Sequence, residues 1–150
     1  MNGITIPVSI RGVYMIETAH GPAPVVILED KSSRIMPIYI GLSEALSIHS
    51  AITHEVPPRP MTHDLFISLL ERMHSKIESI LIDELNDGVY FARLNIVSDT
   101  GHFELDARPS DCIALALRAA SSVFVRGTVF DQAVINKEDL KGALGISSYL

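Results

Sequence analysis

Leu105-Asp106-Ala107-Arg108-Pro109-Ser110-Asp111 connects an alternating stretch of the sequence to an apolar, helix-like stretch. A proline keeps the residue before it extended, and a following serine is a preferred N-cap. The chain is therefore expected to turn sharply from strand to helix here, with Ser110 as the cap. Pro58-Arg59-Pro60-Met61-Thr62-His63-Asp64-Leu65 also sets Arg-Pro before a hydroxyl residue and an aspartate, and predicts a second such turn capped by Thr62. A helix N-terminus carries unpaired N–H groups and a partial positive charge, so each turn is a candidate site for a phosphate or a carboxylate.

Three strands and one helix are expected before these turns. Residues 4–17, 25–28 and 34–40 are rich in β-branched and apolar residues, and clusters of glycine, proline and serine separate them. This pattern predicts a three-stranded meander. Ser43 then fits an N-cap, and apolar residues recur at helical spacing as far as Ile52.

The segments between the two Arg-Pro stretches predict a helix and three strands. Asn86-Asp87-Gly88 favours a tight hairpin turn between strands at 76–85 and 89–97, because these residues tolerate positive φ. In the third strand polar and apolar residues alternate, so Glu104, Asp106 and Arg108 share one face. The helix that starts near Thr62 has one apolar stripe, formed by Leu65, Phe66, Leu69, Leu70 and Met73.

The last third of the chain predicts a buried helix and a short tail. The helix from Ser110 is apolar nearly all round, which indicates burial on several sides, with Arg118 on its exposed strip. A strand at 123–125 and a helix at 137–144 are expected to follow. The whole order indicates the α+β class: one compact domain in which antiparallel or mixed sheets pack with three main helices.

The composition fits a single domain. With 150 residues, 47% of them hydrophobic, the chain can bury roughly 70% of its unfolded surface. We expect one domain over residues 1–150, with a core at about 8–130 and a C-terminal tail at 131–150. The mean hydropathy of +0.28 is high for a soluble chain, so surplus apolar surface is expected to meet another subunit in a dimer or larger homo-oligomer.

Other global features limit the cellular setting and the partners. The longest apolar run, 35–42, is far shorter than the ~18 residues of a membrane span, and Met1-Asn2-Gly3-Ile4-Thr5 lacks a signal-peptide pattern. We therefore expect a cytoplasmic protein without membrane contact. The net charge of −6, without a run of Lys or Arg, disfavours a broad electrostatic grip on nucleic acid. Cys112 is the only cysteine, which excludes an intrachain disulfide.

Four short segments share the order and spacing of a known protein family. They are Pro37-Ile38-Tyr39-Ile40-Gly41, Glu44-Ala45, Arg59-Pro60-Met61-Thr62-His63-Asp64-Leu65 and Asp106-Ala107-Arg108-Pro109-Ser110-Asp111. In these segments the chain resembles the bifunctional nuclease family, over roughly residues 8–130. The resemblance implies one compact α+β domain that forms oligomers and cleaves both DNA and RNA. Cys112 stands where the family pattern leads us to expect alanine.

Asp106, Arg108 and Asp111 form the first candidate site. The two carboxylates could bind Mg²⁺ or Mn²⁺ or activate water, while the arginine holds a phosphate oxygen. Glu104 is a further candidate metal ligand on the same strand face, and Ser110 is a candidate substrate contact. The alternative is structural, with Arg108 paired to both aspartates and Ser110 capping the helix.

His63 and Asp64 form the second candidate site, as a base or a metal ligand, and Arg59 is a candidate phosphate contact. The alternative is a solvated histidine, with Thr62 as the helix cap and Asp64 answering the helix dipole. The sequence leaves open whether the two Arg-Pro stretches meet in one subunit, across an interface, or not at all.

These features support two main hypotheses of function. The first is a nuclease that hydrolyses phosphodiester bonds of DNA and RNA, with or without a divalent metal. Its candidate catalytic residues are Asp106, Asp111, His63 and Asp64. The alternative is a non-catalytic oligomeric module that binds a nucleotide, an anion or a protein partner. A third possibility is that the two stretches only build the fold.

Overall fold

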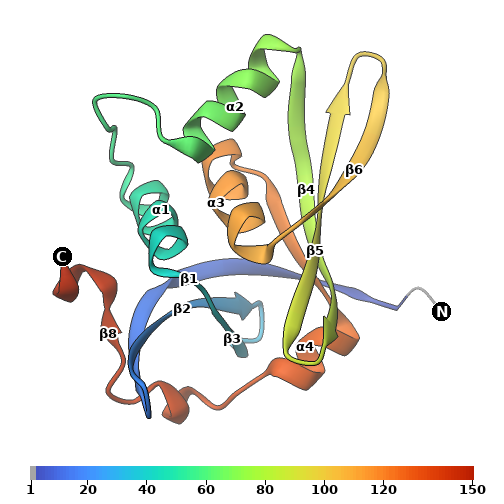
Figure 1. The fold of residues 1–150 in the computed structure, drawn as a ribbon. Helices are drawn as coiled ribbons and strands as arrows, with labels where there is room; N and C mark the ends of the chain where they lie inside the picture. Colours follow the sequence, from blue (N-terminus) through green and yellow to red (C-terminus); the bar gives the residue numbers. More distant parts are fainter. Residues whose placement is uncertain (1–2) are drawn as a thin grey trace.

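One mixed sheet joins the two expected groups of strands in the computed structural model, which describes residues 3–150 (Figure 1). Met1 and Asn2, which belong to the expectation about a signal peptide, lie outside the described residues. The strand order is β3-β2-β1-β7-β4-β5-β6, and β8 pairs with β1. The strands are β1 (Thr5–Thr18), β2 (Gly21–Asp30), β3 (Ile35–Tyr39), β4 (Ser75–Asn86), β5 (Val89–Ser98), β6 (Gly101–Ala107), β7 (Ser122–Arg126) and β8 (Leu144–Gly145).

Both predicted antiparallel groups are confirmed. β1, β2 and β3 pair in sequence, and so do β4, β5 and β6. The β4–β5 turn has φ of 52° at Asp87 and 78° at Gly88, which are the positive values that a tight hairpin requires. β7 then joins the two groups, because it runs parallel to β4 and antiparallel to β1. A parallel pair needs a long crossover connection, and here that connection contains α3.

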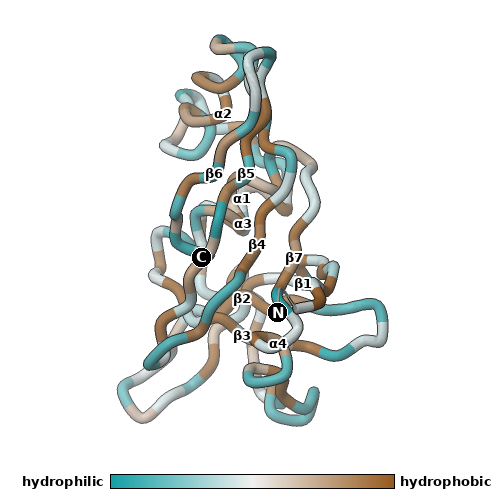
Figure 2. Tube along the Cα trace, turned by 90° about the vertical axis from the view of Figure 1, so that its right-hand side faces the viewer, coloured by the Kyte–Doolittle hydropathy of each residue, from teal (hydrophilic) through white to brown (hydrophobic). Residues whose placement is uncertain are grey.

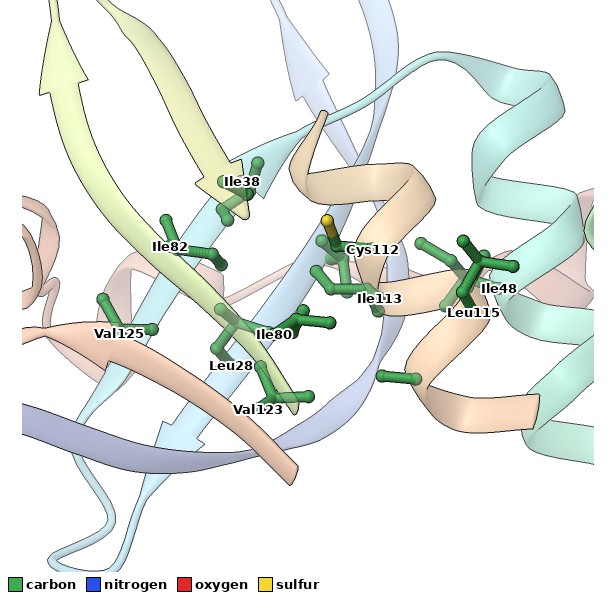
Figure 3. Packing of buried hydrophobic residues seen from close by; sticks show 14 of the residues in the cluster. Leu28, Ile38, Ile48, Ile80, Ile82, Cys112, Ile113, Leu115, Val123 and Val125 are labelled. Carbon is green, nitrogen blue, oxygen red and sulfur yellow. The ribbon is translucent and has the colours of Figure 1, made fainter. Parts of the chain in front are cut away.

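Four α-helices cover this sheet within the described residues: α1 (Leu42–Thr53), α2 (Thr62–Arg72), α3 (Pro109–Ala119) and α4 (Gly127–Ala133). α3 is central, since it contacts α1, α2, β4, β5 and β7. Its residues 112–116 are buried, as the sequence predicts. Figure 3 shows Ile113 of this helix on the side of the strands and Leu115 on its other side, beside Ile48 of α1. The result is one compact α+β domain.

Hydropathy follows the same layout along the chain. Figure 2 shows hydrophobic residues along the middle of β4 and β7, whereas the ends of the hairpins are largely hydrophilic. No helix within residues 3–150 is both long and apolar enough to cross a membrane.

The predicted helix caps are wrong by one or two residues. The N-caps are Gly41, Met61 and Arg108 rather than Ser43, Thr62 and Ser110. The reason is clearest in α3, where Pro109 takes the first helical position. Its fixed φ suits this position, and its missing N–H costs no hydrogen bond there. The serine is thereby placed inside the helix, where it is buried.

Three other expectations are also corrected. The apolar stripe of α2 divides: Leu70 is buried and Phe66 packs on the core, but Leu65, Leu69 and Met73 are exposed. The reason is that α2 packs mainly on α3 and β4, at one end of the domain.

The expected exposed strip of α3 is also covered, since α1 and α2 pack around the side chain of Arg118.

In place of the expected helix at 137–144, the chain forms a short 3₁₀ turn (Lys137–Leu140) and then β8. Gly142 follows that turn with a φ of 88°, which does not suit a continuing helix. A second 3₁₀ turn (Ile146–Tyr149) follows β8. The helix α4 was not predicted from the sequence.

Candidate functional site

The two Arg-Pro stretches meet within one chain at His63. This residue lies in the first turn of α2, and its ring reaches between α1 and α3. Its Nδ1 is 2.6 Å from Oγ of Ser47 on α1, and its Nε2 is 2.9 Å from Oδ1 of Asp111 on α3. Only 15% of the His63 side chain is exposed, so the ring orientation is held by contacts at both nitrogens.

Arg108 completes the site from the N-terminus of α3. Its Nε donates to Oδ2 of Asp111 at 2.9 Å, and its Nη2 donates to Oε2 of Glu44 at 3.2 Å. Glu44 can reach this position because the preceding Gly41 has no Cβ: an added Cβ would collide with Oε1 of Glu44. The Arg108 side chain remains 64% exposed, and no acceptor within residues 3–150 contacts its Nη1. This guanidinium edge is therefore available to a ligand.

Arg118 holds the three helices together beneath the site. Its Nε donates to Oδ1 of Asp64 at 2.8 Å, and its Nη2 donates to the carbonyl oxygen of Ser47 at 3.2 Å. The second carboxylate oxygen of Asp64 accepts from the N–H of Met61, which fixes the start of α2. The arginine side chain is only 12% exposed. It acts as a positioning residue for the segments that carry Ser47 and His63.

The side chains around His63 enclose a pocket of about 250 Å³. It is lined by Ser43, Glu44, Ser47, Met61, Thr62, His63, Arg108 and Asp111. A neighbouring pocket of about 420 Å³ lies on the other side of Arg108 and is lined by residues of β3, the β4–β5 hairpin and the start of α3. Arg108 thus borders both pockets. A polymeric ligand that spanned the two pockets would lie next to the Arg108 guanidinium.

The protonation of the site follows from its ion pairs. Burial alone would raise the pKa of Asp111, but hydrogen bonds from Arg108 and His63 outweigh it and hold this pKa below its usual value. The hydrogen bond from Arg118 lowers the pKa of Asp64, against a smaller opposing effect of burial. Hydrogen bonds to Asp111 raise the pKa of Arg108. Both aspartates are therefore charged at neutral pH.

This charge state fixes the tautomer of a neutral His63. A carboxylate only accepts hydrogen bonds, so the proton between Asp111 and the ring lies on Nε2. Nδ1 then has a lone pair and accepts the hydroxyl proton of Ser47. The arrangement can move a proton between Ser47 and the imidazole beside an exposed arginine.

Comparison with known proteins identifies the family. The family model for the bifunctional nuclease domain matches residues 25–138, which is most of the chain. The chain belongs to the bifunctional nuclease domain family.

Several relatives are similar over the same region. An uncharacterized protein of Mycobacterium tuberculosis is 36% identical over 111 residues, which are 73% of this chain and 66% of that protein. Bifunctional nuclease 1 of Oryza sativa subsp. japonica is 28% identical over 111 residues, 72% of this chain and 34% of that protein. Bifunctional nuclease 2 of the same plant is 25% identical over 138 residues, 89% of this chain and 42% of that protein. The chain thus spans just under two thirds of the mycobacterial relative and about a third of the first rice nuclease.

The bifunctional nuclease domain brings some predicted site residues together. His63, Asp111 and Arg108 share the pocket, while Asp64 lies behind it through Arg118. Ser110 is buried and lines the neighbouring pocket instead.

Other predicted residues lie apart from His63. Arg59 is exposed in the loop before α2, and its guanidinium has no hydrogen bond or ion pair within residues 3–150. Glu104 pairs with Arg93 of β5, and Asp106 lies opposite that same arginine across the two strands. The structural alternative for Arg108 is partly observed. Arg108 forms ion pairs with Asp111 and Glu44, rather than with Asp106 and Asp111.

The predicted metal ligands do not form a ready set of donors. Within residues 3–150, no three His, Cys, Asp or Glu side chains are grouped so that they could hold a metal ion. Glu104 and Asp111 are instead engaged by Arg93 and Arg108 respectively. The side chains present therefore do not fit a preformed site for Mg²⁺ or Mn²⁺ within residues 3–150.

Sequence reasoning missed Ser47. It lies in the middle of α1, where serine has no local signature, and its partner is 16 residues away in the sequence. The one hint to Ser47 in the sequence was its position three residues after Glu44, which belongs to the family-related segment Glu44-Ala45. Residues three apart lie on the same helix face.

Proposed function

We propose that this domain is a nuclease that hydrolyses phosphodiester bonds of DNA and RNA in the pocket around His63. The observation that carries the proposal is the hydrogen-bonded chain from Ser47 through His63 to Asp111, next to the exposed edge of Arg108. A guanidinium matches the geometry of phosphate oxygens and keeps its charge at any relevant pH. An oriented histidine can take up and return a proton.

The roles follow from the contacts. Arg108 would hold a non-bridging oxygen of the scissile phosphate through its uncontacted Nη1. Asp111 keeps the Nε2 proton on His63, so proton transfer takes place at Nδ1, on the side of Ser47. The hydroxyl of Ser47 is then the group through which a proton reaches the ring. The names of the rice relatives agree with this reaction class.

A nuclease assay with matched variants tests the proposal. The purified protein is incubated with quenched single-stranded DNA and RNA reporters in EDTA, Mg²⁺ or Mn²⁺, and activity is followed across the final size-exclusion peak. His63→Ala is expected to lower cleavage by about 100-fold or more, as removal of a positioned acid–base group does. His102→Ala, at an exposed position of β6, is the control and should retain full activity.

The three buffers decide whether a metal takes part. Full activity in EDTA supports a reaction by side chains alone, whereas activity only with a divalent ion would show that the substrate brings the ion or completes its site. Equal cleavage by wild type and His63→Ala would refute the proposed site. Asp106→Asn belongs in the same series, because the strand carboxylates are the other candidate for catalysis.

A binding module is the second candidate function. It is favoured by the ion pairs at the site, since Glu44 and Asp111 already balance the charge of Arg108. Such a module would bind a nucleotide, an anion or a protein partner at Arg108 without turnover. Saturable binding of a labelled oligonucleotide in a preparation that cleaves neither reporter would favour it over the nuclease.

The proposal includes a homo-oligomer. Met61, Leu65, Leu69 and Met73 are exposed and spaced by four residues, so they form one apolar face on α2. A second copy of the chain would cover this face. Light scattering on the size-exclusion peak should show a dimer or larger for wild type and smaller particles for Leu65→Glu. Glu71→Lys, at an exposed position of the same helix away from this face, is the control.

A further inference from the structure

Ser47, His63 and Asp111 make a continuous hydrogen-bonded chain across three helices. The two distances, 2.6 Å from Ser47 Oγ to Nδ1 and 2.9 Å from Nε2 to Asp111 Oδ1, both lie within the range of strong hydrogen bonds. All three side chains line the same pocket as Arg108. This is the arrangement of a nucleophile, a base and a group that orients the base.

The hydroxyl of Ser47 is directed at the histidine rather than at its own helix. A serine in a helix often donates to the carbonyl oxygen four residues earlier. Among residues 3–150, the hydrogen bond to His63 is instead the only one that this side chain makes. Arg118 also donates to the carbonyl oxygen of Ser47, which holds that turn of α1 in place. The geometry is thus fixed from both sides.

We propose that Ser47 is the nucleophile of this site and forms a covalent bond to the phosphorus of a bound phosphodiester. This inference rests on the proposed nuclease function and specifies its mechanism. It adds a residue that the sequence does not single out, and it assigns His63 to the activation of serine rather than of water in the first step.

The reaction takes place in two balanced steps. In the first, Ser47 Oγ bonds to phosphorus while the bond from phosphorus to the leaving oxygen breaks. The serine proton goes to Nδ1 of His63 and then to that leaving oxygen. In the second, water attacks the same phosphorus, its proton goes to Nδ1, and the Oγ–phosphorus bond breaks. Ser47 Oγ takes the proton back, so the net change is the addition of one water molecule.

The substrate range follows from this assignment. A serine nucleophile needs no 2′-hydroxyl of the substrate, so the same steps serve DNA and RNA. The Arg108 guanidinium lies against the carboxylate that orients the histidine, which places a positive charge beside the phosphate under attack. We therefore expect such a site to discriminate little between ribose and deoxyribose.

The test uses a phosphorylating probe on the full chain. Diisopropyl fluorophosphate reacts with an activated serine by forming an oxygen–phosphorus bond and releasing fluoride, and the proton leaves through the neighbouring base. Intact-protein mass and peptide mapping should show one adduct on Ser47 in wild type. The rate of labelling should fall about 100-fold or more in His63→Ala, since the base contributes on this scale. Ser50→Ala is the control, because Ser50 lies on the same helix and its hydroxyl hydrogen-bonds, among residues 3–150, to Glu55 alone.

Nuclease assays on the same preparations separate this inference from the function. We expect Ser47→Ala to fold, with a urea midpoint close to that of Ser50→Ala, and to lose cleavage of both reporters about 100-fold or more. Cleavage retained in Ser47→Ala but lost in His63→Ala would overturn the role of Ser47 and leave the nuclease in place. Labelling of Ser47 in a preparation that cleaves neither reporter would overturn the nuclease instead. Labelling of other residues only, in the folded wild type, would overturn an activated serine without any variant.

Discussion

Replacement of Arg118 by methionine tests whether the site is held by the ion pair beneath it. The change keeps a long side chain but removes the hydrogen bonds to Asp64 and to the carbonyl oxygens of Ser47 and Ala114. A hydrogen bond to a charged group contributes about 1.5–3 kcal/mol, and breaking a fully buried ion pair costs about 3–5 kcal/mol. Because 30% of the Asp64 side chain is exposed, water replaces part of the lost contact. We therefore expect the free energy of unfolding to fall by about 3 kcal/mol, between these two ranges.

Urea denaturation followed by circular dichroism measures this loss. The midpoint should fall with an unchanged m-value, and the melting temperature should drop by roughly 6–12 °C for a domain of this size. Arg93→Met is the matched control, because that arginine pairs with Asp83 but is 52% exposed, and we expect little change in its unfolding free energy. If both variants lost the same free energy, the claim that Arg118 holds the three helices together would be refuted.

The pH dependence gives an independent check on the same contact. The pKa of Asp64 is lowered in the folded state mainly by Arg118, so the pair contributes fully above the unfolded pKa of about 3.9. That contribution is lost as the pH falls through the lower, folded pKa. The difference in unfolding free energy between wild type and Arg118→Met should therefore be constant near neutral pH and shrink below about pH 4. A difference that grew on acidification would contradict the assigned ion pair.

Three further predictions concern the pocket and the core. Gly41→Ala should push the carboxylate of Glu44 away from Arg108 and weaken oligonucleotide binding or cleavage severalfold. The change in stability should stay below about 1 kcal/mol, because φ at this position is ordinary. Unchanged kinetics would show that Glu44 does not position the arginine. Asp111→Asn should remove part of the acid dependence of stability, since the lowered pKa of this residue stabilises the fold above about pH 4 and not below its folded pKa. Urea midpoints of wild type and variant from about pH 3 to 7 measure this, and parallel curves would argue against it. Burial and nearby negative charge raise the pKa of the Cys112 thiol to about 12, so iodoacetamide at pH 8 should label it only after unfolding; rapid labelling of the folded protein would place this thiol at the surface.

Local patterns were sufficient to predict most of the strands and the central helix. Alternation and turn residues identify the meander and the hairpin at Asp87 and Gly88, because these features depend on residues close in sequence. The apolar stretch from Cys112 to Ala116 predicted a buried helix, which the structure confirms. The joining of the two strand groups through β7 was not predictable in this way, since parallel pairing with β4 involves residues more than 40 positions apart.

The exposure of individual side chains was predicted less well. Arg118 was expected on an exposed strip, yet α1 and α2 cover it, because its partners Asp64 and Ser47 come from other helices. Leu65 and Leu69 show the reverse case. Their spacing indicates a buried stripe, but no element within residues 3–150 covers this face of α2.

Residue order and local backbone preferences were enough to predict the family, the α+β class and the two Arg-Pro turns. Three features depend on the tertiary structure: the turns meet in one chain, His63 lies between Ser47 and Asp111, and Asp106 lies opposite Arg93 on the neighbouring strand instead. A hydrogen bond between helices depends on their packing. That packing is set by the whole apolar core, and no short segment of the sequence encodes it.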